Sequence, residues 1–139
     1  MENISKVRQS LNRAQKKQAD VMNRLLNSQS YIAAQVYERY KTCGNKNCKC
    51  KKGELHGPFL WIYQNKKNQK ILSTTVDMNK EKQAKDLAKR YKQWLLNRQK
   101  LRELNRVIQD HLDEMGKFLE KDAREFATAR KSGRPKKNE

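Results

Sequence analysis

The chain has 139 residues, of which 35% are apolar and 35% are charged, and its formal net charge is +18. This apolar content is too small for a thick hydrophobic core. We therefore expect one modest, elongated, helix-rich domain. No apolar run approaches about 18 residues and no charged-then-apolar leader follows Met1, which predicts a cytoplasmic, nucleoid-associated protein without a membrane span.

The charge is distributed unevenly along the chain. Residues 1–102 hold 24 Lys and Arg against 7 Asp and Glu, whereas residues 103–125 hold 4 against 7. Such a basic body repels itself unless a polyanion neutralises it, and phosphate backbones are the commonest polyanion in a cell. We therefore expect a nucleic-acid partner, duplex DNA before structured RNA. The alternative is a merely solvated surface, but such surfaces usually carry comparable Glu.

The first segment, residues 1–28, predicts a basic amphipathic helix of about six turns. Its seam positions alternate by three and four residues, and all except Gln18 are apolar: Ile4, Val7, Leu11, Ala14, Gln18, Val21 and Leu25. Such a seam needs a partner helix.

The middle segment, residues 31–77, changes from helical to alternating periodicity. Residues 36–41, 58–63 and 70–76 predict three short antiparallel strands, with a turn at 64–69. A unit this small is not stable alone, and a metal site is the usual remedy.

All three cysteines lie within eight positions, at Cys43, Cys48 and Cys50. An odd number of clustered thiols in a reducing compartment favours metal ligands over disulfides. In an extended segment Cys48 and Cys50 would project from one face, and Gly44 lets the chain turn after Cys43.

Three thiolates need a fourth ligand to complete a tetrahedron, and His56 is the nearest candidate. Gly53, Gly57 and Pro58 predict a turn that brings its imidazole back over the loop. Cys3His is a structural zinc set that leaves no open position for catalysis, so we expect bound Zn2+. Three reduced cysteines without metal, or an iron–sulfur cluster, are the alternatives, although a cluster normally uses four cysteines.

Lysines crowd this loop, where they would offset the charge of the metal centre and contact phosphates. The candidate nucleic-acid contacts in and beyond the loop are Lys46, Lys49, Lys51, Lys52, Lys66, Lys67, Lys70 and Arg90.

The box R-Y-x-x-C-G-x(3)-C-x-C-x(5)-H-G-P-F, from Arg39 to Phe59, is followed by a hairpin and a long helix. It resembles a family of small uncharacterised bacterial, archaeal and phage proteins that are frequently encoded beside mobile elements. The resemblance covers roughly residues 31–105. It implies that Cys43, Cys48, Cys50 and His56 act together, and it suggests a partner in DNA recombination, but it implies no activity.

Phe59, Trp61 and Tyr63 alternate along the second strand, so their rings share one face of the sheet, while Leu60 and Ile62 share the other. Larger rings bury more area, so we expect the rings to form the core. If the aliphatic pair packs inward instead, the rings are left as a platform on which unpaired bases could stack.

The third segment, residues 78–131, supplies the partner helix. Asp77 or Asn79 can cap its start, and Ser132-Gly133 is a natural stop. Its seam repeats the alternation at Leu87, Tyr91, Trp94, Arg98, Leu101, Asn105, Ile108, Leu112, Met115 and Leu119. Arg98 and Asn105 could pair with Gln18 across the seam.

The sequence thus predicts an α+β fold. A small three-stranded, zinc-stabilised antiparallel sheet is inserted between an N-terminal helix and a long C-terminal helix, which pack antiparallel as a helical hairpin or coiled coil. A four-helix arrangement in a homodimer is the other possibility.

The C-terminal tail, residues 132–139, contains GRPKK, which weakly resembles an AT-hook that lies in the minor groove of A/T-rich DNA. The candidate contacts are Arg134, Lys136 and Lys137. Ser132 stands where that pattern has a first Arg, so a generic basic tail that contacts phosphates is an equal alternative.

No enzymatic activity is expected. His56 is assigned to metal, His111 has no paired nucleophile, and the chain has no Gly-rich phosphate loop. We expect a non-catalytic DNA-binding accessory protein of a mobile-element, recombination or phage nucleoprotein complex. We expect its protein partner to be a larger recombinase or nuclease. One alternative is an RNA-binding accessory subunit of a ribonucleoprotein. The other is an adapter or regulator whose acidic segment 110–125 and helical seam dock a large nuclease or transposase.

Overall fold

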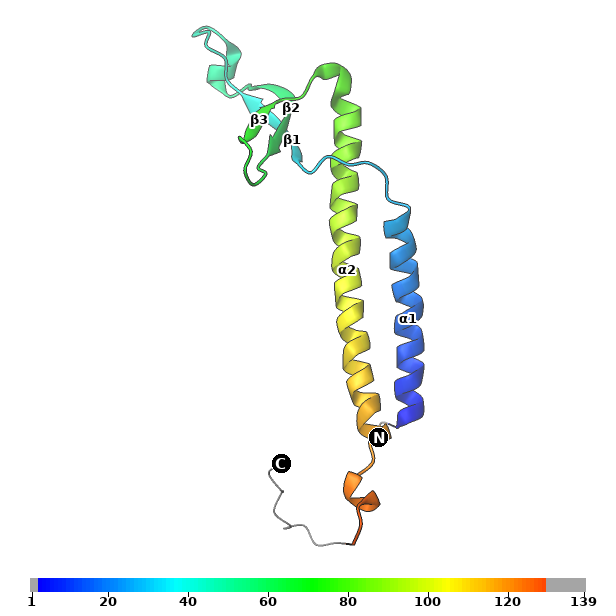
Figure 1. The fold of residues 1–139 in the computed structure, drawn as a ribbon. Helices are drawn as coiled ribbons and strands as arrows, with labels where there is room; N and C mark the ends of the chain where they lie inside the picture. The colour runs from blue at the N-terminus through cyan, green and yellow to red at the C-terminus, as the bar shows by residue number, and fades with distance from the viewer. Residues whose placement is uncertain (1–2, 130–139) are drawn as a thin grey trace.

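The protein is described by a computed structural model over residues 3–129 (Figure 1). The chain begins with the helix α1 (Ile4–Leu26) and continues with three strands, β1 (Gln35–Lys41), β2 (His56–Gln64) and β3 (Leu72–Thr75). The long helix α2 (Glu81–Leu119) follows the strands. Short 3-10 turns lie at Lys49–Lys52, Met78–Lys80 and Ala123–Phe126. The predicted α+β fold is confirmed. Over these residues, neither helix is long and apolar enough to cross a membrane.

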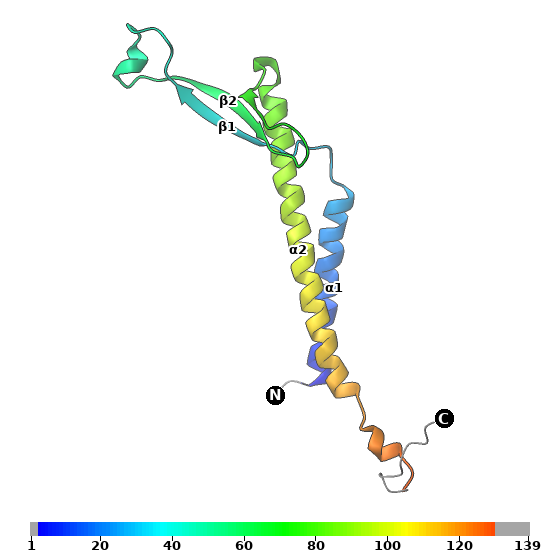
Figure 2. The same ribbon diagram turned by 60° about the vertical axis from the view of Figure 1, so that its left-hand side comes forward.

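The two helices pack side by side and antiparallel along the length of α1 (Figures 1 and 2). Asn3 begins α1 by accepting a hydrogen bond from the backbone N–H of Lys6 at 3.0 Å. The residues of α1 that α2 buries are Val7, Ala14 and Val21, and the other predicted seam positions of α1 are half-buried. The seam predicted for α1 is therefore confirmed.

The apolar stripe of α2 differs from the predicted seam at four positions that are exposed: Arg98, Asn105, Leu112 and Leu119. Asn97 is half-buried in place of Arg98, and Leu101, Leu104 and Ile108 continue the stripe. An α-helix repeats every 3.6 residues, so a strict heptad drifts by about 20° in two turns and one neighbour can replace another at the contact. Because a guanidinium is costly to bury, Arg98 stays in water.

The predicted end of the long helix at Ser132-Gly133 is wrong, because α2 ends at Leu119 and Glu120 is extended. The last turn carries a favourable cation, Lys117, and the backbone N–H of Glu120 closes the helix by donating to the carbonyl oxygen of Gly116 at 2.8 Å. Asp122 then accepts a hydrogen bond from the backbone N–H of Arg124 at 2.9 Å, which begins a separate 3-10 turn. The described part of the expected segment 78–131 is therefore a 3-10 turn, the helix α2 and, after Leu119, a second 3-10 turn at Ala123–Phe126.

The sheet has the strand order β1-β2-β3, with both pairs antiparallel. β3 is shorter than the predicted strand at residues 70–76. After it, Asp77 caps the 3-10 turn that precedes α2, because its carboxylate accepts a hydrogen bond from the backbone N–H of Asn79 at 3.0 Å. One face of the sheet lies against the first turns of α2. Leu60 is 5% exposed there, and Ile62 lines a hollow with Ala84 and Leu87 of α2.

The expectation that the aromatic rings form the core is wrong for Phe59 and Trp61. Leu60 and Ile62 face α2, and Phe59 and Trp61 lie on the opposite face of the sheet, where Phe59 is 36% exposed. Tyr63, the third ring of the row, is half-buried and lines a hollow with Tyr91 and Leu95 of α2. Ala84 and Ala88 bring the α2 backbone close to the sheet, which leaves room for aliphatic side chains rather than large rings. We call the face with Phe59 and Trp61 the outer face.

The linker between α1 and β1 is fastened along α2. The ring of Tyr31 lies 5.1 Å from that of Tyr91 and 5.9 Å from that of Trp94, between centroids. Arg90 donates a hydrogen bond to the carbonyl oxygen of Ser30 at 3.3 Å. Tyr91 and Trp94 thus pack within the fold, as their helical spacing predicted.

Candidate metal centre

The β1–β2 hairpin projects away from both helices and carries residues 42–55 at its far end, which we call the hairpin tip (Figure 2). The tip contains the 3-10 turn Lys49–Lys52, which Gly53 ends with a left-handed backbone conformation (φ +106°). Asn45 folds the preceding stretch by accepting a hydrogen bond from the backbone N–H of Asn47 at 3.0 Å. These local turns bring the two ends of the tip together.

The four predicted ligands lie on different parts of this hairpin. Cys43 follows β1, Cys48 precedes the 3-10 turn, Cys50 lies within it and is 2% exposed, and His56 is the first residue of β2. The sequence interpretation placed Cys48 and Cys50 in an extended segment, whereas the chain turns between them. His56 reaches the site from a strand that pairs with Lys41, and not from a turn.

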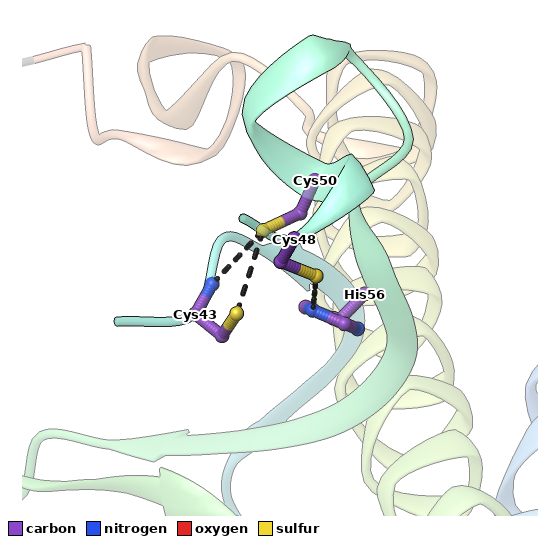
Figure 3. Close-up of side chains that lie close together, drawn as sticks. All are labelled: Cys43, Cys48, Cys50 and His56. Carbon is purple, nitrogen blue, oxygen red and sulfur yellow. Dashed lines mark hydrogen bonds between the residues drawn. The ribbon is translucent and has the colours of Figure 1, made fainter. Parts of the chain in front are cut away.

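The four side chains converge on one point (Figure 3). Their three sulfurs and one imidazole nitrogen all lie within 4.8 Å of one another. The Cys48 sulfur is 3.1 Å from His56 Nε2, and the Cys43 and Cys50 sulfurs are 3.6 Å apart. Two sulfurs that share a tetrahedral zinc are about 3.8 Å apart, so the cluster has the dimensions of a metal site. It could bind a metal ion with four protein ligands.

The thiols of this cluster differ in acidity. A backbone hydrogen bond at Asn45, followed in size by one from His56, lowers the pKa of Cys43 to about 6. For Cys50, the backbone N–H of Cys43 donates to the sulfur and lowers its pKa, but burial and the nearby thiols outweigh this and raise the pKa overall. One thiolate is therefore present at neutral pH, and a cation would stabilise the others.

Gly57 lets the hairpin close beside the cluster. Its φ is +132°, and a Cβ atom there would lie 2.8 Å from the carbonyl oxygen of Arg39 on the neighbouring strand. The register of the β1–β2 pair shifts at this level, between Arg39 and Lys41. Only glycine fits both the backbone conformation and the space, which is a physical reason for the glycine after His56.

The basic residues proposed from the sequence fall into separate groups. The first group is exposed in the hairpin tip and comprises Lys46, Lys49, Lys51 and Lys52. The second group is exposed in the β2–β3 connection, at the opposite end of β2, and comprises Lys66, Lys67 and Lys70. Arg90 lies on α2 beside the linker, and Arg134, Lys136 and Lys137 lie outside the described residues.

Two cations on the outer face were not anticipated from the sequence. The guanidinium of Arg39 lies 4.6 Å from the ring centroid of Trp61, and the ammonium of Lys41 lies 4.8 Å from that of Phe59. Side chains alternate between the two faces along each strand, which could have placed Arg39 and Lys41 on the face of Phe59 and Trp61. The β1–β2 register shifts between Arg39 and Lys41, however, and this shift cannot be read from the sequence.

The comparison with known proteins identifies a family without assigning a function. Residues 6–94 match a domain of unknown function, DUF6788, and no curated protein or solved structure matches the chain. The matched range includes most of α1, which the resemblance noted in the sequence did not cover, together with the whole sheet and the first part of α2. The chain belongs to the DUF6788 family.

Proposed function

We propose that this protein is a zinc-stabilised, non-catalytic nucleic-acid-binding accessory protein with duplex DNA as its first partner. Zn2+ would be held by Cys43, Cys48, Cys50 and His56, and its role would be structural because four protein ligands leave no coordination position for a substrate. The ligand types support zinc as the metal, since three thiolates and an imidazole bind zinc better than calcium, magnesium or manganese, which prefer oxygen ligands.

Structural need also supports a metal at this place. The hairpin tip lies far from the two helices, and Cys50 is its only buried residue. A segment with so little apolar burial cannot offset the conformational entropy of its own ordering. Metal binding would supply that free energy, as it does in other small metal-stabilised modules.

The observation that carries nucleic-acid binding is the exposed charge of the hairpin tip. Its four lysines are all exposed, and Glu54 is the one carboxylate within residues 42–55. A rigid projecting loop of this charge is suited to phosphate contacts, which position a protein on nucleic acid without reading sequence. The net charge of the chain gives further support, because a polyanion relieves its self-repulsion.

A protein partner is supported by the other end of the molecule. The last turns of α2 extend to the end opposite the sheet (Figure 1), and Leu112, Phe118 and Leu119 are 40 to 52% exposed there. Asp113 and Glu120 are their exposed neighbours in sequence, and Lys117 and Lys121 lie in the same stretch. We propose that this end docks a larger recombinase or nuclease, in line with the mobile-element setting that the sequence box suggests.

One titration tests the nucleic-acid proposal. Binding to duplex DNA and to RNA of equal length is measured against salt concentration, and each phosphate contact contributes about −0.9 to the logarithmic salt slope on B-DNA. A steep slope with preference for duplex DNA supports the proposal, and preference for structured RNA supports a ribonucleoprotein role. If both bind no more tightly than nonspecific polyanions do, the protein is an adapter.

A further inference from the structure

We propose that the outer face of the sheet binds unpaired bases of single-stranded DNA. The surface consists of Tyr37, Arg39, Lys41, Phe59 and Trp61. This inference rests on the proposed DNA-binding function and adds the form of DNA that the sheet would accept. Nucleic acid with an unpaired segment would then contact the hairpin tip through phosphates and the sheet through bases.

The rings on this face are accessible and held in place. Tyr37 is 40% exposed and stands opposite Trp61 in the β1–β2 register, while Phe59 is 36% exposed. The indole N–H of Trp61 donates to the hydroxyl oxygen of Ser73 on β3 at 2.9 Å. An aromatic side chain fixed in this way loses little entropy when a base stacks on it.

Charge on the outer face favours a nucleic acid over an apolar protein segment. Arg39 lies over Trp61 and Lys41 over Phe59, so each of these two rings has a cation within 5 Å that can also contact a phosphate. The register places no carboxylate on this face, because Glu38 points to the other side and lies 3.8 Å from Lys85 of α2. The two lysine groups lie beyond the two ends of β2, so positive charge continues along the strand in both directions.

The spacing of the rings favours single-stranded over duplex DNA. Phe59 and Trp61 are two residues apart on one strand, so their attachment points are separated by about 6.7 Å. Neighbouring bases in a duplex are stacked about 3.4 Å apart and present only their edges to a protein. Two rings at twice that distance suit a strand whose bases have been separated, with one base on each ring.

The experiment measures binding of oligo-dT, oligo-rU and a duplex of equal length to the full-length, zinc-loaded protein. The variants are Phe59→Leu, Trp61→Leu and the two combined. Phe126→Leu is the control, because Phe126 is 74% exposed and lies beyond α2. Phe59→Leu and Trp61→Leu should each weaken oligo-dT binding about tenfold, because the stacking of one base contributes about that factor. Both variants should leave duplex binding unchanged. Phe126→Leu should leave oligo-dT and duplex binding unchanged.

Fluorescence provides an independent readout. In a Trp94→Phe background, which keeps an aromatic ring against Tyr31, Trp61 is the remaining tryptophan, and oligo-dT should quench its emission. Oligo-dT binding that survives loss of both rings, or that leaves Trp61 unquenched, would overturn the inference while the DNA-binding function stands. Tighter, ring-dependent binding of oligo-rU would also overturn it in favour of RNA. Absence of binding to any of the three would remove the proposed function as well.

Discussion

Gln18 of α1 donates a hydrogen bond from Nε2 to Oδ1 of Asn105 on α2, at 2.7 Å. The two residues are 87 positions apart in the chain and form the polar pair that the sequence predicted across the helical seam. An amide pair of this kind contributes to alignment, because each side chain satisfies the other only in one register. Because the pair is exposed and water can replace either partner, it favours this register of α1 on α2 by a modest free energy.

A double-mutant cycle at this pair should detect coupling. We expect Gln18→Ala and Asn105→Ala each to lower the free energy of unfolding modestly, with an interaction of about 0.5 to 1 kcal/mol between them, since a net hydrogen bond contributes about that much. Chemical unfolding of the four proteins measures it. Gln99 and Glu103, which pair within α2 at 3.3 Å, provide a matched cycle that should leave the helix register unaffected. Additive effects at Gln18 and Asn105 would show that the amides act separately.

The helical hairpin was predictable because its information is local and periodic. Val7, Ala14 and Val21 recur at a spacing that only a helix places on one face, and the cysteine cluster was predictable because zinc ligands lie close together in sequence. The orientation of the sheet was not predictable in this way. Alternation shows that Leu60 and Trp61 lie on opposite faces, but α2 decides which face is covered.

The metal site predicts loss of bound metal on substitution of a ligand. Cys48→Ser should reduce zinc stoichiometry and unfold the hairpin tip, because three ligands hold a structural ion much less tightly than four. Elemental analysis and hydrogen exchange of residues 42–55 measure the two effects. His56→Ala should behave like Cys48→Ser, whereas His111→Ala is the matched control, since this histidine lies on α2 beside Glu114. Unchanged zinc content in Cys48→Ser would exclude this ligand set.

The acidity of the thiols in the folded cluster predicts their order of alkylation as a chelator removes zinc, before the hairpin tip unfolds. The pKa of Cys43 is lowered from 9.0 to about 6, so at pH 7 it is largely the nucleophilic thiolate, while the pKa of buried Cys50 is raised. Iodoacetamide at pH 7 should modify Cys43 first, as peptide mass mapping would show. Because the folded pKa of Cys43 is depressed, its contribution to stability is full above pH 9 and is lost as the pH falls through about 6. Equal labelling of Cys43 and Cys50 by iodoacetamide would contradict the predicted order of alkylation.

Gly57 predicts a backbone effect on the hairpin beside the metal cluster. Gly57→Ala places a Cβ atom 2.8 Å from the Arg39 carbonyl oxygen at a φ of +132°, which should destabilise the hairpin by about 1 to 3 kcal/mol. Gly44→Ala is the matched control, because nothing lies within 4 Å of its added Cβ. Thermal unfolding with and without zinc compares the two. A Gly57→Ala protein as stable as Gly44→Ala would show that the strands can separate without cost.

The two lysine groups at the ends of β2 predict separable contributions to DNA binding. Replacing Lys46, Lys49, Lys51 and Lys52 with Gln should lower the logarithmic salt slope by about 0.9 for each lysine that contacts a phosphate, and replacing Lys66, Lys67 and Lys70 should do the same independently. Their effects should add, because the length of β2, about 30 Å, separates the groups by several Debye lengths at physiological salt.

Glu54→Gln provides the control of opposite sign for the hairpin tip. It removes the one carboxylate among residues 42–55, so it should strengthen DNA binding without adding a phosphate contact. Filter binding across a salt series measures all of these variants. A salt slope that changes only with the lysines of the β2–β3 connection would place the DNA at the helix end of the sheet, and the hairpin tip would then have a purely structural role.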